Sequence, residues 1–131
     1  MSVAGRVSIV GVFHDTPSTN TIRVHAIQCT EEKSGGLVAR VTGTCATQKI
    51  TIQHDAVPDQ EYPGRTINFT TITRIVAKAS AVCEFTDQDG HFTMYAGTEG
   101  AASSHLMATA KDLKVNAVSG TATYDIIIYG A

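Results

Sequence analysis

Five histidines are the side chains of this sequence best suited to bind a metal ion: His14, His25, His54, His91 and His105. Imidazole nitrogen is a common zinc ligand, and a metal site in a β-protein would need histidines from several strands to converge. None of the five forms a close His-x-His or His-x-x-x-His pair. The pairs His14-Asp15 and His54-Asp55 fall where strands are expected to end, and a polar turn explains them. We therefore expect no metal and no other cofactor.

Two further motifs are better explained by structure than by chemistry. Asp87-x-Asp89-Gly90 begins like a calcium loop, but no glutamate stands at the position where an EF-hand needs its bidentate ligand. A β-turn accounts for these residues. Cys83 could act as a nucleophile, yet it alternates with Ala81 and Phe85 on an apolar strand face, which predicts an inert buried thiol.

No other motif indicates an enzyme. The sequence has no phosphate-binding glycine loop, no Gly-x-Ser-x-Gly and no cluster of paired carboxylates. Asn68-Phe69-Thr70 matches a glycosylation acceptor, but we expect no secretory route. Cys29 and Cys45, like Cys83, are expected to be buried thiols, because three widely spaced cysteines form no disulfide framework. We expect no catalytic residue.

The elements around these residues are expected to be strands. Valine and isoleucine total 23 against 3 leucines, with 18 threonines and no tryptophan. β-Branched side chains suit a pleated surface, so this composition predicts an all-β chain. At 131 residues it predicts a single β-domain, residues 1–131: an antiparallel β-sandwich of the jelly-roll or Greek-key kind with about eight to ten strands.

Alternation of apolar and polar residues locates the expected strands. Val7, Ile9, Gly11 and Phe13 share one face of the first, and Ile22, Val24 and Ala26 share one face of the second. Residues 54–65 are expected to form a crossing loop, and residues 97–104 a small-residue loop. The other expected strands cover residues 37–44, 49–53 and 66–86, the last with a break near Ala77–Ala79, and residues 105–111 fit either a helical turn or a short strand.

Two hairpins are predicted with registers. A four-residue loop at Asp87–Gly90 places Phe85 opposite Phe92 and Cys83 opposite Met94. The dipeptide Ser119-Gly120 is predicted to connect two paired strands. Its register places Ala117 opposite Ala122, Val115 opposite Tyr124 and Leu113 opposite Ile126.

Surface character indicates protein partners. Charged residues make up 17% of the chain, against about 25% in a typical soluble domain. The net charge is −2 without a basic stripe, so we expect no nucleic-acid partner. Apolar runs are too short to cross a bilayer, and we expect no membrane association. The segment Thr123–Tyr129 is apolar on both faces, which predicts either a central strand or burial against another chain.

The threonine- and alanine-rich alternating strands, the low charge, the Gly97–Ser104 loop and the Asp125–Tyr129 end together resemble small bacteriophage virion proteins, most nearly capsid decoration or cement proteins. The resemblance implies a non-enzymatic subunit, synthesised in the host cytoplasm and located in the virion. It also implies a homo-oligomer, with a trimer favoured, which contacts the major capsid protein or other virion subunits. A phage tail-tube or fibre component is a variant of the same expectation.

Two other classes of function stay open at this stage. One is a carbohydrate- or ligand-binding β-sandwich, which predicts a pocket with Tyr62, Tyr95 or Tyr129 exposed. The other is a cupin-like metal enzyme, which predicts bound metal held by two or more of the five histidines.

Overall fold

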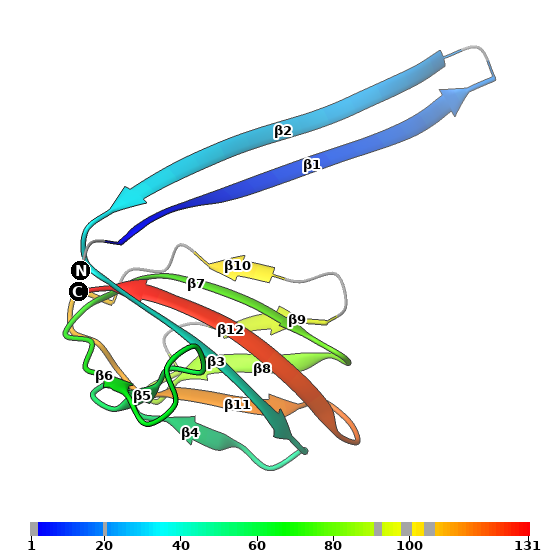
Figure 1. The fold of residues 1–131 in the computed structure, drawn as a ribbon. Coiled ribbons are helices and arrows are strands. Elements are labelled where there is room, and N and C mark those ends of the chain that lie inside the picture. Colours follow the sequence, from blue (N-terminus) through cyan, green and yellow to red (C-terminus); the bar gives the residue numbers. More distant parts are fainter. Residues whose placement is uncertain (1–2, 20, 91–92, 98–100, 104–106) are drawn as a thin grey trace. The chain divides into compact units, whose positions relative to one another are not determined.

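The computed structural model describes residues 3–19, 21–90, 93–97, 101–103 and 107–131. The described residues form strands and no helix, which confirms the predicted all-β class (Figure 1). The strands number twelve and belong to four sheets, more than the eight to ten strands of a single sandwich. They are β1 (Ala4–Ser18), β2 (Thr21–Ser34), β3 (Leu37–Cys45), β4 (Ile50–Ile52), β5 (Val57–Pro58), β6 (Thr66–Ile67), β7 (Ile72–Ala79), β8 (Cys83–Asp87), β9 (Thr93–Ala96), β10 (Ala101–Ser103), β11 (Leu113–Ala117) and β12 (Ala122–Gly130).

Contacts within the chain divide it into two units, Met1–Gly35 and Gly36–Ala131. The first unit is a hairpin of β1 and β2, and the second contains the other ten strands. Gly35 and Gly36 connect them, both with positive φ, a conformation that side chains with a Cβ adopt rarely. The prediction that residues 1–131 act as one domain stays a prediction.

The second unit consists mainly of two four-stranded antiparallel sheets. Their strand orders are β10-β7-β12-β3 and β4-β11-β8-β9, and the short pair β5-β6 forms a separate sheet (Figure 1). Alternate residues of both large sheets enter one hydrophobic core, as period-two patterning requires. Large side chains of this core include Ile75, Ile126 and Ile128 from the first sheet, and Phe85, Leu113 and Val115 from the second.

Strand β12 confirms one of the two alternatives for the C-terminal segment. It lies between β7 and β3, so its backbone is paired on both sides. Ile126 and Ile128 are fully buried, whereas Ile127 points to the opposite face and is 43% exposed. The apolar run is therefore explained by a central strand, with one isoleucine left on the outer face.

The predicted pairing of the last two strands is wrong. Strand β11 pairs with β8 and β4, and β12 pairs with β7 and β3, so the Ser119-Gly120 turn carries the chain from one sheet to the other. Leu113 and Ile126 are both buried, as the proposed register required. They enter the core from different sheets, however. Matching of apolar residues does not distinguish pairing within one sheet from packing across the core.

The other predicted hairpin exists with a shifted register. Strand β8 pairs with β9 so that Phe85 lies opposite Met94 and Cys83 opposite Ala96. The shift of two residues keeps every side chain on its predicted face. Phe92 lies outside the described residues. The break expected near Ala77–Ala79 comes slightly later, because β7 continues to Ala79.

The two expected loops are only partly irregular. Residues 54–65 contain β5, and part of the 97–104 segment forms β10. Met107 makes a single antiparallel bridge to Ile72, which fits the strand alternative for this region; His105 is not among the described residues. Among the described residues, no helix has the length and apolar character needed to cross a bilayer.

Candidate interaction surface

The hairpin of β1 and β2 is a long ribbon without a third strand. Twelve consecutive residue pairs run from Ala4 opposite Ser34 to Asp15 opposite Arg23. In the described part of the chain, neither strand pairs with anything except the other. Near its base, the Gly35 N–H donates to the Val3 carbonyl at 2.7 Å. A two-stranded hairpin is at best marginally stable in water, so this ribbon calls for packing against something else.

Both faces of the hairpin expose apolar side chains. Val12 lies opposite Ala26, and this face also carries Val10 and Val24, both more than half exposed. On the other face, Phe13 is 72% exposed and Ile27 is 75% exposed. These fractions are far above those of side chains that pack in a core.

The register explains why both faces are apolar. The predicted stripe that ends at Phe13 points to one side of the ribbon, whereas the stripe of Val24 and Ala26 on the second strand points to the other. The sequence predicts these two strands as part of the sandwich, but they form a separate two-stranded sheet whose described side chains are mostly exposed. Each stripe is regular by itself, and only the pairing reveals that the two are out of phase.

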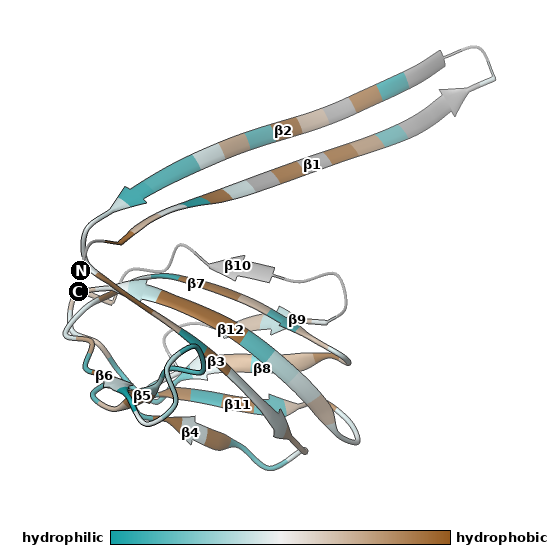
Figure 2. Ribbon diagram, viewed as in Figure 1, coloured by the Kyte–Doolittle hydropathy of each residue, from teal (hydrophilic) through white to brown (hydrophobic). Residues whose placement is uncertain are grey.

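Charge is confined to the base and the tip region of the hairpin. Residues 7–14 and 24–30 contain no lysine, arginine, aspartate or glutamate. At the base, the Lys33 Nζ lies 2.8 Å from the Glu31 carboxylate, in a stretch that also includes Glu32 and Arg6. Figure 2 shows this hydrophilic end of β2 beside the more hydrophobic middle. A solvent-facing strand normally carries charges along its length, so the uncharged middle is typical of a contact surface.

The outer face of the sheet β10-β7-β12-β3 offers a second weakly charged surface. Ile127 and Val38 are exposed there on neighbouring strands. An open groove of about 660 Å³ lies on this sheet. Its lining is mostly small and polar, and consists of Thr42, Gly43, Thr44, Gln60, Lys78, Ala79, Ser80, Thr123, Tyr124 and Asp125.

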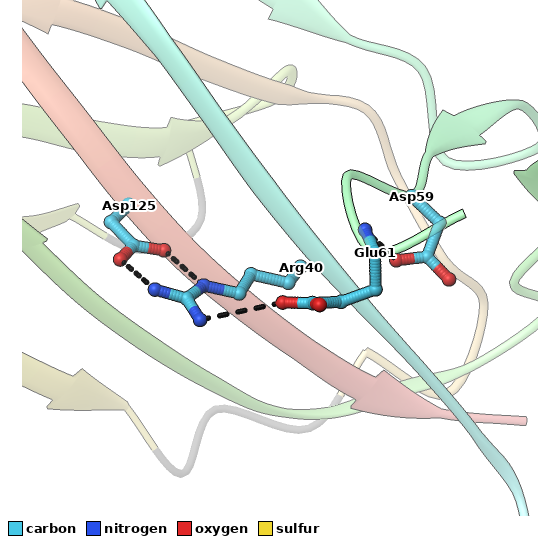
Figure 3. A network of polar contacts seen from close by, with 4 residues as sticks. All are labelled: Arg40, Asp59, Glu61 and Asp125. Carbon is cyan, nitrogen blue, oxygen red and sulfur yellow. Dashed lines mark hydrogen bonds and ion pairs between the residues drawn. The ribbon is translucent and has the colours of Figure 1, made fainter. Parts of the chain in front are cut away.

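An ion-pair network lies next to this groove, which the exposed Lys78 also lines (Figure 3). The Arg40 Nε and Nη2 donate to the two Asp125 carboxylate oxygens at 2.9 and 2.7 Å, and Nη1 lies 3.4 Å from Glu61. The hydrogen bonds from Arg40 hold the pKa of Asp125 below its usual value, and the same bonds raise the pKa of Arg40. The Glu61 N–H donates to Asp59, which fixes the loop that carries Glu61.

The outer face of the sheet β4-β11-β8-β9 has a different character. The Tyr95 hydroxyl donates to Glu84 at 3.2 Å, and the negative charge of Glu84 raises the pKa of Tyr95. The Lys114 ammonium on β11 donates to the Thr51 hydroxyl on the neighbouring strand β4. This surface is that of a sheet that faces water.

One histidine takes part in a cluster that has metal-ligand composition. In the described part of the chain, His54, Asp55 and Asp112 are the group whose ligand atoms come within 4.8 Å of one another. The His54 Nδ1 lies 2.6 Å from Asp112 Oδ1, which also accepts the His54 backbone N–H at 3.0 Å. These bonds, the backbone one first, lower the pKa of Asp112. The geometry is that of a histidine–carboxylate hydrogen bond between a loop and the start of β11.

The other histidines do not join this cluster. His14 is exposed on the hairpin. His91 and His105, and the side chain of His25, lie outside what the structure describes. A site of several converging histidines is therefore not formed by the described residues.

The cysteines differ from one another. Cys45 and Cys83 are buried as predicted, with their sulfur atoms 3.6 Å apart between the two large sheets. Burial first, and then the hydrogen bond with Cys45, raises the pKa of Cys83 to about 12. Cys29 is exposed on the hairpin, so the prediction that it is buried is wrong.

The other residues singled out in the sequence lie in a turn or on the surface. Asp87–Gly90 forms a turn in which the Gly90 N–H donates to the Asp87 carbonyl at 3.2 Å, as the β-turn interpretation requires. Tyr62 and Tyr95 are exposed as expected, but neither lines the groove on the first sheet. Arg65 lies over the Tyr62 ring at 4.9 Å.

Comparisons of the chain with family models, with curated proteins and with solved structures find no match. The hairpin is the surface that sequence reasoning missed. Its signal was present in the sequence as two uncharged segments, residues 7–14 and 24–30, in a chain that is otherwise sparsely charged.

Proposed function

We propose that this chain is a non-enzymatic structural subunit that works by burying its hairpin against other protein chains. The observation that carries this proposal is the exposure of apolar side chains on both faces of β1 and β2. Burial of the Phe13 side chain in a protein contact would contribute about 1.5–3 kcal/mol to the free energy of association, and burial of Ile27 would contribute a similar amount.

The assembly that we propose is a virion shell, on which the chain is a capsid decoration or cement subunit. This part of the proposal rests on the resemblance described under Sequence analysis. The low charge and the neutralised outer face around Arg40 and Asp125 support it, because weakly charged surfaces suit close contacts between subunits. We further infer that the two large sheets are a β-sandwich of the jelly-roll or Greek-key kind.

A ligand-binding role has less support. A carbohydrate site normally presents aromatic rings beside polar groups in one pocket. The groove on the sheet β10-β7-β12-β3 is lined by small polar side chains, and the exposed Tyr62 and Tyr95 lie elsewhere. The hairpin therefore supports assembly more strongly than the groove supports sugar binding.

Co-sedimentation with capsid shells tests the proposal. The chain would be co-expressed with the major capsid protein encoded in the same genome, and the shells would be separated by density-gradient centrifugation. We expect the wild-type chain to travel with the shells and the double variant Val12→Asp with Ile27→Asp to stay at the top. Val118→Asp is the matched control, because Val118 is 54% exposed and Val12 is 52% exposed.

Failure of the wild-type chain to sediment with the shells would contradict the decoration role. Equal loss of binding in the Val118→Asp control would show that any added charge disrupts the contact. In that case the hairpin would no longer carry the proposal.

A further inference from the structure

We propose that the partner of the hairpin is a second copy of this chain, and that the hairpin of one copy lies along the outer face of the sheet β10-β7-β12-β3 of the next. This inference rests on the proposed assembly function and identifies the partner. It follows from three properties of the described surfaces: their apolar character, their charge and their area.

The chemistry of the hairpin excludes two other kinds of partner. Binding to a lipid surface is favoured by lysine and arginine beside the apolar side chains, and residues 7–14 and 24–30 contain neither. A nucleic acid needs lysine or arginine against its phosphates, and residues 7–14 and 24–30 contain neither. A protein surface that is itself uncharged and partly apolar is the partner that fits.

The chain carries such a surface. Ile127 and Val38 are exposed on the outer face of the first sheet, and Val76 lies opposite Ile127 on β7. Arg40 is bonded to Asp125 and lies near Glu61, and Lys78 on β7 lies opposite Asp125, whose pKa its charge helps to lower. The two cations on this part of the face thus lie beside two carboxylates of the same copy. An uncharged ribbon can therefore approach this sheet without leaving a buried charge unpaired.

The shape of the sheet surface also suits an extended ribbon. Six of the ten residues that line the groove are threonine, serine, glycine or alanine, whose short side chains let a neighbouring backbone come close; the others are Gln60, Lys78, Tyr124 and Asp125. Hydroxyl groups at Thr42, Thr44 and Thr123 offer hydrogen bonds to backbone groups of an incoming strand. Among the described strands, β1 and β2 pair only with each other, so their outer edges can offer backbone groups to such hydroxyls.

The area of the hairpin is sufficient for a specific contact. Twelve residue pairs at about 3.3 Å per residue give a ribbon roughly 40 Å long, and two strands with their side chains are about 10 Å wide. One face of the ribbon therefore offers roughly 400 Å². In a reciprocal pair each copy buries one hairpin face and one sheet face, roughly 800 Å² in total, which is the area that each partner buries in a standard stable interface.

The donating surface and the receiving surface are different parts of the chain. Such a contact allows two closed arrangements. The copies can form a ring, in which each hairpin lies on the sheet of the next copy, or a pair, in which each copy places its hairpin on the sheet of the other. It also allows a complementation experiment, because a copy with a damaged hairpin still has an intact sheet. A copy with a damaged sheet still has an intact hairpin.

The experiment uses the purified full-length chain and two single variants. Ile27→Asp damages the hairpin, and Ile127→Asp damages the sheet surface; both positions are exposed, at 75% and 43%. Molar mass is measured by light scattering after size-exclusion chromatography over a range of concentrations. Protection of Cys45 and Cys83 from a thiol reagent checks that each variant keeps its core.

We expect the wild-type chain and the Val118→Asp control to form a multimer, and each single variant to associate about tenfold to a hundredfold more weakly. An equimolar mixture of the two variants is expected to form a complex of two chains, because it contains one intact hairpin and one intact sheet. Cys29 is expected to react more slowly with a thiol reagent in the wild-type multimer than in either variant.

Three results would overturn the inference: a monomeric wild-type chain, variants that remain multimeric, or a mixture that does not associate. A monomeric wild-type chain that still sediments with capsid shells would overturn self-association alone and leave the proposed assembly function in place. A multimer that assembles through the hairpin but ignores the shells would support the inference and contradict the decoration role.

Discussion

Arg40 and Asp125 form a two-point ion pair across neighbouring strands, with nitrogen–oxygen distances of 2.9 and 2.7 Å. The pair joins β3 to β12 on the outer face of their sheet and, through Glu61, reaches the loop that begins near Asp59 (Figure 3). Bidentate geometry of this kind is more specific than an ordinary surface ion pair. It makes Asp125 the carboxylate to test on this sheet.

The first prediction concerns acid stability. Because the native pKa of Asp125 is lowered, its contribution to stability is present above the ordinary carboxyl pKa and is lost as the pH falls through the native value. We expect the melting temperature of the wild-type chain to fall as the pH decreases from about 5 to 2. The fall should be smaller in Asp125→Asn. Glu61→Gln is the control, since it removes only the 3.4 Å contact and leaves both bonds to Asp125.

The second prediction concerns alkaline stability. The pKa of Cys83 is raised from 9.0 to about 12, so the unfolded chain releases this proton at a lower pH than the native chain does. The stabilisation from the buried neutral thiol is therefore complete below pH 9 and is lost as the pH rises toward 12. Urea unfolding at pH 7 and pH 10 should show a smaller decrease in Cys83→Ala than in the wild-type chain. An equal decrease in both would contradict the assignment to Cys83.

The third prediction compares adjacent residues of β12. Ile126→Ala should lower the free energy of unfolding by about 2–5 kcal/mol, because it leaves a cavity in the shared core. Ile127→Ala, at an outer-face position, should lower it by less than about 1 kcal/mol when the chain is monomeric. Denaturant titrations of both variants measure this difference. Similar losses of unfolding free energy in the two variants would contradict the placement of Ile126 in the core and of Ile127 on the outer face.

The fourth prediction concerns the cluster of His54, Asp55 and Asp112. We interpret the short His54–Asp112 contact as a hydrogen bond that holds a loop, so a chelator or added zinc should not change the melting temperature. Asp112→Ala should destabilise the chain by about 1 kcal/mol, and Asp112→Asn by less, because the amide oxygen can still accept the His54 backbone N–H. A zinc-dependent rise in melting temperature that disappears in His54→Ala would contradict this interpretation.

The sequence was sufficient to predict the all-β class and the buried Cys45 and Cys83, and a central position of the last strand was one of its two alternatives for that segment. Each of these depends on local alternation and on burial within a few residues. The true partners of Leu113 and Ile126 could not be predicted in this way. Two apolar side chains fit equally well when they are paired within one sheet and when they face each other across a core.

The hairpin illustrates a second limit of sequence reasoning. Alternation along one strand says which residues share a face, but the relative phase of two strands is set by the turn between them. Here the phase places the stripe that ends at Phe13 and the stripe of Val24 and Ala26 on opposite sides, so both faces of the hairpin carry exposed apolar side chains. The prediction for Cys29 was wrong because it rested on the number and spacing of the cysteines, which carry no information about the face on which each side chain lies.

The regular pairing from Ala4 to Asp15 also makes the hairpin a molecular ruler. Adding or deleting two residues in each strand would change its length by about 7 Å and return every remaining side chain to its original face. Adding or deleting one residue in each strand would instead move every side chain between that point and the tip to the opposite face of the hairpin. Spacing between the hairpin tip and its base can therefore be varied in discrete steps, while the ten strands after Gly36 keep their own pairing.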